Sequence, residues 1–388
     1  MNTFSNSVRG LFVTIMIAGL AGFSTPTPAV AQVAAPPAPD LSAKSYILID
    51  FNSGLVLAEK NPDERLEPAS ITKLMTAYAV FRAIKSGQIN LADEVTISEK
   101  AWRTEGSRMF VEVGTRVTVE QLLPGMIIPS GNDASVALAE YVGGTEETFA
   151  QVMNDLAAEL SMTNSQFRNA TGLPMDGHYT TARDISTLAR ALIREFPDYY
   201  RWYSQREFTY NGITQANRNT LLGRDDSVDG MKTGWTESAG FCLVTSAKRG
   251  DMRLISVVLG TDSATARANE SQALLNYGFR FFETRQVWDK GAVIANQRVW
   301  KGAEPAVDLV VREPVFATVP SGSLAKIETV VDSPAQLMAP IDESSPIGSV
   351  KAEIDGKTVA EAKLYSAKSV PEGGFFQTTW DEILLFFE

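Results

Sequence analysis

Three short motifs in this sequence combine serine, lysine and asparagine in a pattern that can make a nucleophile out of serine without histidine. An SxxK, an SxN and a KTG motif follow each other along the chain and comprise Ser70 and Lys73, Ser130 and Asn132, and Lys232, Thr233 and Gly234. An SxxK pair alone carries little weight, because ordinary serine and lysine usage gives about one by chance in a chain of this length. Ser323 and Lys326 form such a chance pair. The ordered set of three motifs is the informative feature.

The first motif fits a helix that presents a nucleophile and a base on one face. Ser70 and Lys73 are three positions apart, and residues at this spacing are neighbours on a helix surface. Pro68 suits the first turn, where free backbone N–H groups and the positive end of the dipole would stabilise an oxyanion at Ser70. Lys73 accepts the serine proton only when neutral, and burial beside a cation such as Lys232 would lower its pKa. An ordinary helix start with a solvated lysine is the alternative.

The second motif lies between Pro129 and the helical run 134–142, which predicts a loop that leads into a helix. A loop can direct a hydroxyl and an amide into a cleft. Ser130 is therefore a candidate to relay a proton to a leaving amine, and Asn132 is a candidate to bind the substrate backbone. Simple capping of the helix by Asn132 or Asp133 is the alternative.

The third motif precedes an apolar run, as expected for an edge strand that lines a cleft. Lys232 and Thr233 offer a cation and a hydroxyl to a substrate carboxylate, and Gly234 lets another backbone approach closely. A turn that ends in glycine is the alternative.

The rest of the chain predicts the elements that hold these motifs. With 388 residues, 44% of them hydrophobic and 21% charged, the chain can form two domains with a large core. Hairpins are predicted around residues 52–54 and 248–251, and a capping box at Thr118 opens a helix. Apolar periodicity predicts further helices near residues 149–160, 182–195 and 268–277, the last ending at Gly278.

The C-terminal part of the chain has a different sequence pattern. From about residue 287, short β runs separated by proline and glycine predict a small β domain that ends near residue 370. Residues 371–374 break the chain before an amphipathic helix, whose apolar face consists of Phe376, Trp380, Ile383, Leu384 and Phe387.

Composition excludes several classes of function. The net charge of −11 makes nucleic acid an unlikely partner, because an acidic surface repels phosphate backbones. The single cysteine, Cys242, allows no internal disulfide and lies in an apolar run typical of a buried thiol. The single histidine, His178, excludes a multi-histidine metal site and lies in a turn-like segment, where we expect a surface residue. No metal and no cofactor are expected.

The N-terminus has the features of a secretory signal over residues 1–31. Arg9 precedes an apolar run at 11–23 that is too short to span a bilayer, and Ala29 and Ala31 supply a small-residue cleavage site. An uncleaved anchor is the alternative. The prolines and alanines of residues 32–40 predict an extended linker.

The three motifs resemble those of the penicillin-recognising serine acyl-transferases, the group of penicillin-binding proteins and serine β-lactamases. The sequence is most similar to low-molecular-mass penicillin-binding proteins that act as D-alanyl-D-alanine carboxypeptidases, and this likeness extends to residues 130–134, 217–219, 228–234 and 277–284. The resemblance implies an α/β (α+β) fold. A β-lactamase/transpeptidase-like domain, an antiparallel sheet flanked by helices, would occupy residues 41–286. A small all-β domain at 287–370 and an amphipathic segment at 371–388 would follow.

The resemblance also implies roles for single residues. Ser70 would be the acyl-ester nucleophile, and Lys73 would be its general base. Ser130 would relay a proton, and Lys232 and Thr233 would bind the substrate carboxylate. Arg218 and Arg267 match family arginines near that carboxylate, and the backbone N–H of Trp235 would join that of Ser70 in an oxyanion hole. Many relatives have histidine where Trp235 stands, so the rate or pH dependence of deacylation could differ.

The function implied is a serine-type D-Ala-D-Ala carboxypeptidase that trims peptidoglycan stem pentapeptides in the periplasm and is acylated by β-lactams. The C-terminal helix would hold it on the outer face of the inner membrane. Residues 375–388 contain no lysine or arginine, so such binding would rest on apolar burial alone, and docking on the β domain or on a partner is the alternative.

Two other functions are possible. A serine β-lactamase would need a deacylating glutamate after the SxN loop, and residues 164–173 offer none. A non-catalytic cell-wall binding or scaffold protein would be expected to have lost a catalytic residue, yet all three motifs are intact.

Overall fold

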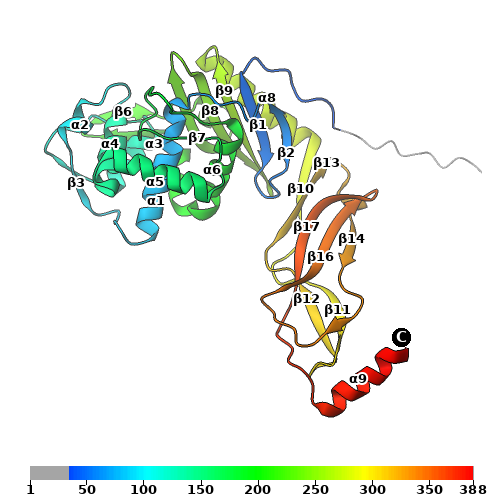
Figure 1. Cartoon of the computed structure of the whole chain (residues 1–388). Helices are drawn as coiled ribbons and strands as arrows, with labels where there is room; N and C mark the ends of the chain where they lie inside the picture. The colour runs from blue at the N-terminus through cyan, green and yellow to red at the C-terminus, as the bar shows by residue number, and fades with distance from the viewer. Residues whose placement is uncertain (1–34, 388) are drawn as a thin grey trace, which may run out of the picture. The chain divides into compact units, whose positions relative to one another are not determined.

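The computed structural model describes residues 35–387 (Figure 1). The predicted signal segment, residues 1–31, and residues 32–34 of the predicted linker lie outside the described residues. Within the described range, helices and strands are interspersed up to residue 281, and strands predominate afterwards. No helix in this range has the length and apolar character that crossing a membrane requires.

A five-stranded antiparallel sheet lies at the centre of the first part and has the order β2-β1-β9-β8-β7. Its strands are β1 (Ser45–Asp50), β2 (Val56–Lys60), β7 (Val228–Thr236), β8 (Gly240–Arg249) and β9 (Met252–Thr261). The hairpins predicted around residues 52–54 and 248–251 join β1 to β2 and β8 to β9. The KTG motif lies on β7, which is an edge strand of this sheet as expected.

The sheet separates two hydrophobic cores, because successive side chains of a strand point to opposite faces. On β1, Ile47 and Ile49 belong to the core formed with the helices between β2 and β7. Tyr46 and Leu48 belong to the other core, which includes Leu274 of α8 (Ala264–Phe281). All residues of β1 are buried, as expected for a strand that is covered on both faces.

The helices of the first core carry two of the three motifs. They are α1 (Lys73–Lys85), α2 (Glu99–Arg103), α3 (Val119–Ile127), α4 (Asn132–Gly143), α5 (Glu146–Glu159), α6 (Ala182–Glu195) and α7 (Pro197–Tyr200). The capping box predicted at Thr118 is present at the start of α3. The predicted helix at Ser70 is divided, because a 3-10 turn, η1 (Ala69–Thr72), precedes α1.

Short elements complete this part of the chain. A two-stranded antiparallel sheet pairs β3 (Glu94–Thr96) with β4 (Arg116–Thr118), and a small hairpin joins β5 (Glu207–Tyr210) to β6 (Ile213–Ala216). The 3-10 turns η2 (Arg201–Ser204) and η3 (Thr220–Gly223) lie in the same part.

The prediction that Gly278 ends a helix is wrong, since α8 continues to Phe281. A Cβ atom at position 278 would lie 2.5 Å from Leu254 Cδ1 and 3.1 Å from Leu48 Cδ2. The glycine therefore allows α8 to pack closely on the sheet, and it has no role as a helix stop.

The C-terminal part is built of strands, as expected. A two-stranded sheet pairs β10 (Phe282–Trp288) with β13 (Val315–Pro320). A six-stranded sheet has the order β14-β16-β17-β12-β11-β15, with β14 (Glu328–Asp332), β16 (Pro346–Ile354), β17 (Lys357–Ser366), β12 (Ala306–Val310), β11 (Val293–Trp300) and β15 (Leu337–Met338). A 3-10 turn, η4 (Leu324–Lys326), precedes β14, and the predicted C-terminal helix is α9 (Phe375–Phe387). Val299, Leu309, Val350 and Leu364 form a core separate from the first two.

Candidate active site

The three motifs meet at a cavity of about 300 Å³. Each motif reaches it from a different element: the 3-10 turn η1, the loop before α4, and the edge strand β7. The residues that line the cavity are Ser70, Ser107, Ser130, Arg218, Thr233, Gly234, Trp235, Phe241, Ala264 and Arg267. The predicted residues outside this lining are Lys73, Asn132 and Lys232. Lys73 is hydrogen-bonded to Ser70 and to Asn132, and Lys232 to Ser130. The structure thus brings all ten predicted site residues together.

Lys73 is buried directly beside the candidate nucleophile. Its Nζ lies 2.9 Å from Ser70 Oγ, 2.7 Å from Asn132 Oδ1 and 2.6 Å from the carbonyl oxygen of Thr171. A protonated amine would donate to all three atoms. A neutral amine keeps two donors for Asn132 and Thr171, which leaves its lone pair for the hydroxyl proton of Ser70. The geometry therefore suits a general base.

The electrostatic environment favours the neutral form of Lys73. Burial and, to a lesser extent, the guanidinium of Arg218 together lower the pKa of this amine to about 7, against the opposing effect of Asp133 and Glu146. Burial, with the charge of Lys73, also holds the pKa of Lys232 well below its usual range. The cation that lowers the pKa of Lys73 is therefore Arg218, which was not foreseen, and not Lys232 as the sequence suggested. Lys232 is instead the lysine whose pKa the charge of Lys73 lowers.

The loop before α4 and the first residue of this helix direct Ser130 and Asn132 into the site. Ser130 adopts a left-handed backbone conformation, with φ of 69°, and its Oγ accepts a hydrogen bond of 2.8 Å from Lys232 Nζ. Asn132 Oδ1 accepts from Lys73, and its Nδ2 donates to the carbonyl oxygen of Glu105 at 2.6 Å. Capping of α4 by Asn132 is therefore wrong, because Gly131 is the N-cap residue and the Asn132 amide is bonded elsewhere.

The carboxylate of Asp133, in the first turn of α4, has a structural task, and the alternative of capping by this residue is also wrong. Asp133 is fully buried, and its two oxygens accept backbone N–H groups of Met109 and Phe110, each at 2.8 Å. These bonds fasten the segment that contains Ser107 and Glu105 against the start of α4. Asp133 thus holds one wall of the cavity in place.

The edge strand β7 closes the other side of the cavity. Gly234 allows close approach to η1, because a Cβ atom there would lie 3.0 Å from the carbonyl oxygen of Pro68. Arg267 on α8 donates to the carbonyl oxygen of Gly234 at 3.0 Å, and Arg218 Nε donates to that of Pro129 at 2.9 Å. Both guanidinium groups line the cavity beside Thr233, so this side carries the positive charge expected of a carboxylate site.

Sequence reasoning missed the segment behind Lys73. The Thr171 carbonyl that binds Lys73 is held by a turn in which Asn169 Oδ1 accepts the N–H groups of Thr171 and Gly172 at 3.1 and 2.7 Å. Gly172 has φ of 84°, and a Cβ atom there would overlap the carbonyl oxygen of Ala69. The Asn-Ala-Thr-Gly run was the available signal, but a contact made by a backbone carbonyl leaves no side-chain signature.

The expectation that His178 lies on the surface is wrong, since its side chain is buried. The ring contacts Phe167 edge-on, its Nδ1 accepts the backbone N–H of Arg168, and its Nε2 lies 2.8 Å from Thr72 Oγ1. Burial and, to a lesser extent, the charge of Arg168 together lower the pKa of His178 to about 4, so the ring is neutral at pH 7. His178 thus supports the turn between Ser70 and Lys73. Cys242 is buried as expected, and burial raises the pKa of its thiol to about 11.

The sheet between two layers, together with a serine and a desolvated lysine at its edge, defines a serine acyl-transferase of the penicillin-recognising group. The family model of D-alanyl-D-alanine carboxypeptidase matches residues 31–263, and that of the penicillin-binding protein 5 C-terminal domain matches residues 282–372. This chain therefore belongs to the D-alanyl-D-alanine carboxypeptidase family. The resemblance seen in the motifs, the fold class and the prediction of a serine-type enzyme are confirmed.

Individual relatives agree with this assignment. D-alanyl-D-alanine carboxypeptidase DacC of Escherichia coli (strain K12) is 44% identical over 358 residues, which are 90% of each chain. The solved structure of penicillin binding protein 5 from Haemophilus influenzae has 40% identity and a TM-score of 0.84, and the match covers 87% of this chain and 100% of that one. Penicillin-binding protein D2 from Listeria monocytogenes, solved in its ampicillin-bound form, has 30% identity and a TM-score of 0.58 over 63% of this chain and 100% of that one.

Proposed function

We propose that this protein removes the terminal D-alanine from peptidoglycan stem pentapeptides through an acyl-enzyme on Ser70. The observation that carries the proposal is the 2.9 Å contact between Ser70 Oγ and a buried Lys73 amine whose pKa is lowered to about 7. The family assignment supports the reaction, and the arginines beside Thr233 suit a substrate that ends in a free carboxylate.

In the proposed acylation step, neutral Lys73 takes the proton of Ser70, and Oγ attacks the carbonyl carbon of the penultimate D-alanine. The negative charge that forms on the carbonyl oxygen is bound by the backbone N–H groups of Ser70 and Trp235. The C–N bond then breaks, Ser130 passes its proton to the leaving amine of D-alanine, and the proton that Lys73 accepted replaces it on Ser130, so both groups return to their starting state. Water later attacks the ester carbonyl, which releases the shortened peptide and restores the hydroxyl of Ser70.

Lys232 and Asn132 keep these groups in position in this mechanism. Lys232 donates to Ser130 Oγ at 2.8 Å, so the hydroxyl of Ser130 is free to direct its own proton toward the cavity. Asn132 binds Lys73 through its oxygen, and in the proposed complex its amide nitrogen contacts the substrate backbone. The carboxylate of the leaving D-alanine lies at Thr233, Arg218 and Arg267.

Assay of D-alanine release tests the proposed function. Purified protein is incubated with a pentapeptide that ends in D-Ala-D-Ala, and the control peptide ends in L-Ala. We expect release of D-alanine from the first peptide alone, together with a slowly hydrolysed penicillin adduct detected by mass spectrometry. Rapid penicillin turnover without peptide cleavage would instead assign a β-lactamase, and a protein without either activity would assign the non-catalytic cell-wall role.

We propose the same division of the chain as the sequence suggested. The catalytic domain spans residues 41–286, the β domain residues 287–370 and the amphipathic segment residues 371–388. The ranges matched by the two family models, 31–263 and 282–372, support this division. Residues 1–31 form a secretory signal and residues 32–40 a linker, so the enzyme acts in the periplasm, where its peptidoglycan substrate lies.

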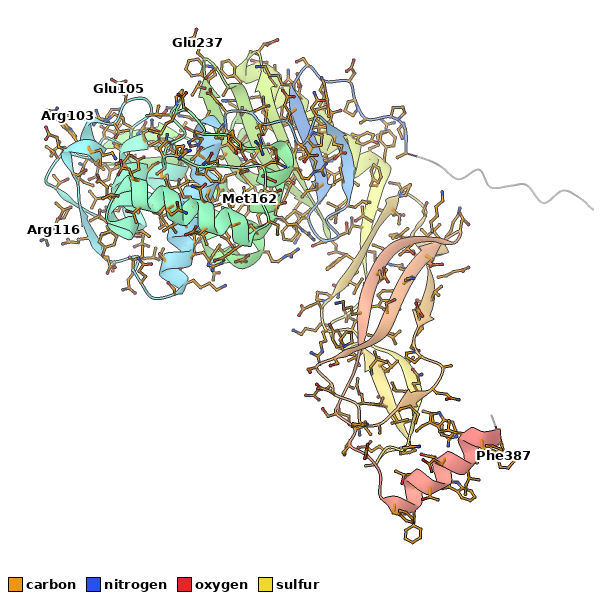
Figure 2. All side chains as sticks on the ribbon, in the orientation of Figure 1. Arg103, Glu105, Arg116, Met162, Glu237 and Phe387 are labelled. Carbon is orange, nitrogen blue, oxygen red and sulfur yellow. The ribbon has the colours of Figure 1, made fainter. Side chains whose placement is uncertain are left out.

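We further propose that α9 binds the outer surface of the inner membrane. The apolar side chains Phe376, Trp380 and Phe387 are 88%, 59% and 80% exposed, and Figure 2 shows Phe387 at the end of the helix. The opposite side of α9 is fixed to the strands, because the buried Asp381 carboxylate accepts the backbone N–H of Lys301 at 2.6 Å and lies 3.3 Å from an Arg298 nitrogen. The helix therefore holds its apolar side away from the strands, which suits a lipid surface.

Deleting residues 375–388 should abolish binding to lipid vesicles in a sedimentation assay. Full-length protein should bind phosphatidylcholine vesicles, and anionic lipid should not increase the bound fraction, because α9 carries no lysine or arginine. Replacing Phe376 and Phe387 by serine tests the exposed side alone and should reproduce the loss while D-alanine release is retained. Equal sedimentation of the full-length and shortened proteins would rule out this mode of binding.

A further inference from the structure

Trp235 is a large aromatic side chain left open at the catalytic cavity. Its side chain is 56% exposed, although Gly234 and Thr233 before it on β7 are buried. Its directly paired residue on β8 is Phe241, and the two rings lie 5.7 Å apart with an angle of 37° between their planes. Cross-strand aromatic pairs of this kind stabilise each other. The indole therefore has a defined position beside the cavity while one side of it stays uncovered.

This aromatic pair is continuous with the positively charged side of the cavity. The guanidinium of Arg267 lies 5.5 Å from the centre of the Phe241 ring and donates to the carbonyl oxygen of Gly234. Thr233 and Trp235 are two positions apart on β7, so their side chains leave the strand on the same side. A ligand whose carboxylate contacts Thr233 and Arg267 is thus placed next to Trp235.

The cavity offers apolar contact at this wall. Trp235, Phe241 and Ala264 line it together, whereas the other lining residues are serine, threonine, arginine and glycine. In the proposed reaction, the residue whose carboxylate is bound here is the leaving C-terminal residue. Its side chain therefore has one apolar surface within reach, and that surface is larger than the methyl group of alanine can cover.

We propose that Trp235 and Phe241 form a specificity wall for the side chain of the leaving D-residue, so that the enzyme also releases bulky apolar C-terminal D-residues such as D-phenylalanine. This inference rests on the proposed carboxypeptidase function and adds a selection step to it. The indole contacts the side chain of the leaving residue, whereas the backbone N–H of Trp235 binds the carbonyl oxygen in the same way for every substrate. Changes at the indole should therefore alter the ratio between substrates more than the rate with D-alanine.

The test compares two pentapeptides that differ only in their last residue, D-alanine or D-phenylalanine. The ratio of kcat/KM values, D-phenylalanine over D-alanine, should fall about fivefold in Trp235→Ala, since one aromatic contact is lost. Trp235→Phe should keep the ratio within about twofold of wild type by the same reasoning. Trp102→Ala removes a partly exposed tryptophan that does not line the cavity and should leave both values unchanged.

The outcomes separate this inference from the proposed function. If wild-type protein releases D-alanine but not D-phenylalanine, or if Trp235→Ala leaves the ratio unchanged, the specificity wall is refuted and the carboxypeptidase function stands. If neither peptide is cleaved, the proposed function itself is refuted. A stability measurement of each variant by thermal unfolding excludes misfolding as the cause, and a ratio of two substrates is insensitive to the fraction of active protein.

Discussion

Ser70→Ala should abolish D-alanine release and covalent labelling by penicillin together, with kcat/KM for the peptide falling by a factor of about 10⁴ to 10⁶. The hydroxyl of Ser70 is the group that forms the ester, and Lys73 Nζ lies 2.9 Å from it in position to take its proton. Removing the oxygen therefore removes the nucleophile and leaves the base without a reaction partner.

The chain supplies a matched control for this experiment. Ser323 and Lys326 repeat the SxxK spacing in the C-terminal part, where they flank and form the short 3-10 turn η4. No side chain of this second pair lines the catalytic cavity. Ser323→Ala should therefore leave peptide cleavage and the penicillin adduct unchanged. A residual adduct on Ser70→Ala, mapped by peptide mass analysis to another side chain, would contradict the assignment of the nucleophile.

The sequence was sufficient to identify the three motifs that meet at the cavity, because short spacings along single elements determine which side chains point in the same direction. The resemblance added Arg218, Trp235 and Arg267, whereas the lining residues Ser107, Phe241 and Ala264 were not predicted. The three-residue spacing of Ser70 and Lys73 keeps both on one side of η1 and α1, and the KTG motif precedes an apolar strand that is an edge. Most of the helices and hairpins were also predictable, since periodicity and capping residues act locally. The role of each site residue in catalysis remains a prediction, which the variants at Ser70, Lys73 and Arg218 test.

What the sequence could not reveal are contacts between segments distant along the chain. The burial of His178 depends on Thr72, which is 106 positions away, and the Lys73 contact with Thr171 spans 98 positions and uses a backbone carbonyl. Likewise, glycine often ends a helix, which predicts a helix end at Gly278. The close packing of Leu254 and Leu48 against this position is instead the reason for the glycine. Sequence patterns describe the local preference of a residue. For His178, Thr171 and Gly278, contacts with distant segments determine the burial, the hydrogen bond and the helix packing that are observed.

The rate of acylation of Ser70 by a penicillin should rise with pH, with a midpoint near 7. Lys73 acts as a base only in its neutral form, and its pKa is lowered to about 7 by burial and by Arg218. Below the midpoint the amine is protonated and the rate falls, and above it the rate reaches a plateau. Lys73→Arg should lower the plateau by a factor of about 10² to 10⁴ and remove this pH dependence, since a guanidinium stays protonated.

Two arginine variants separate the electrostatic effect from substrate binding. Arg218→Gln removes a cation that lowers the pKa of Lys73, so the midpoint should move to higher pH. Arg267→Gln is the matched control, because Arg267 also lines the cavity but is not among the charges that shift Lys73. For both variants, the acylation rate is measured at saturating penicillin over the pH range, so that a change in penicillin affinity does not affect the midpoint. If the midpoint moves equally in both variants, or in neither, Arg218 does not set the pKa of Lys73. If the wild-type rate is independent of pH between 5 and 9, Lys73 is not the group that accepts the proton.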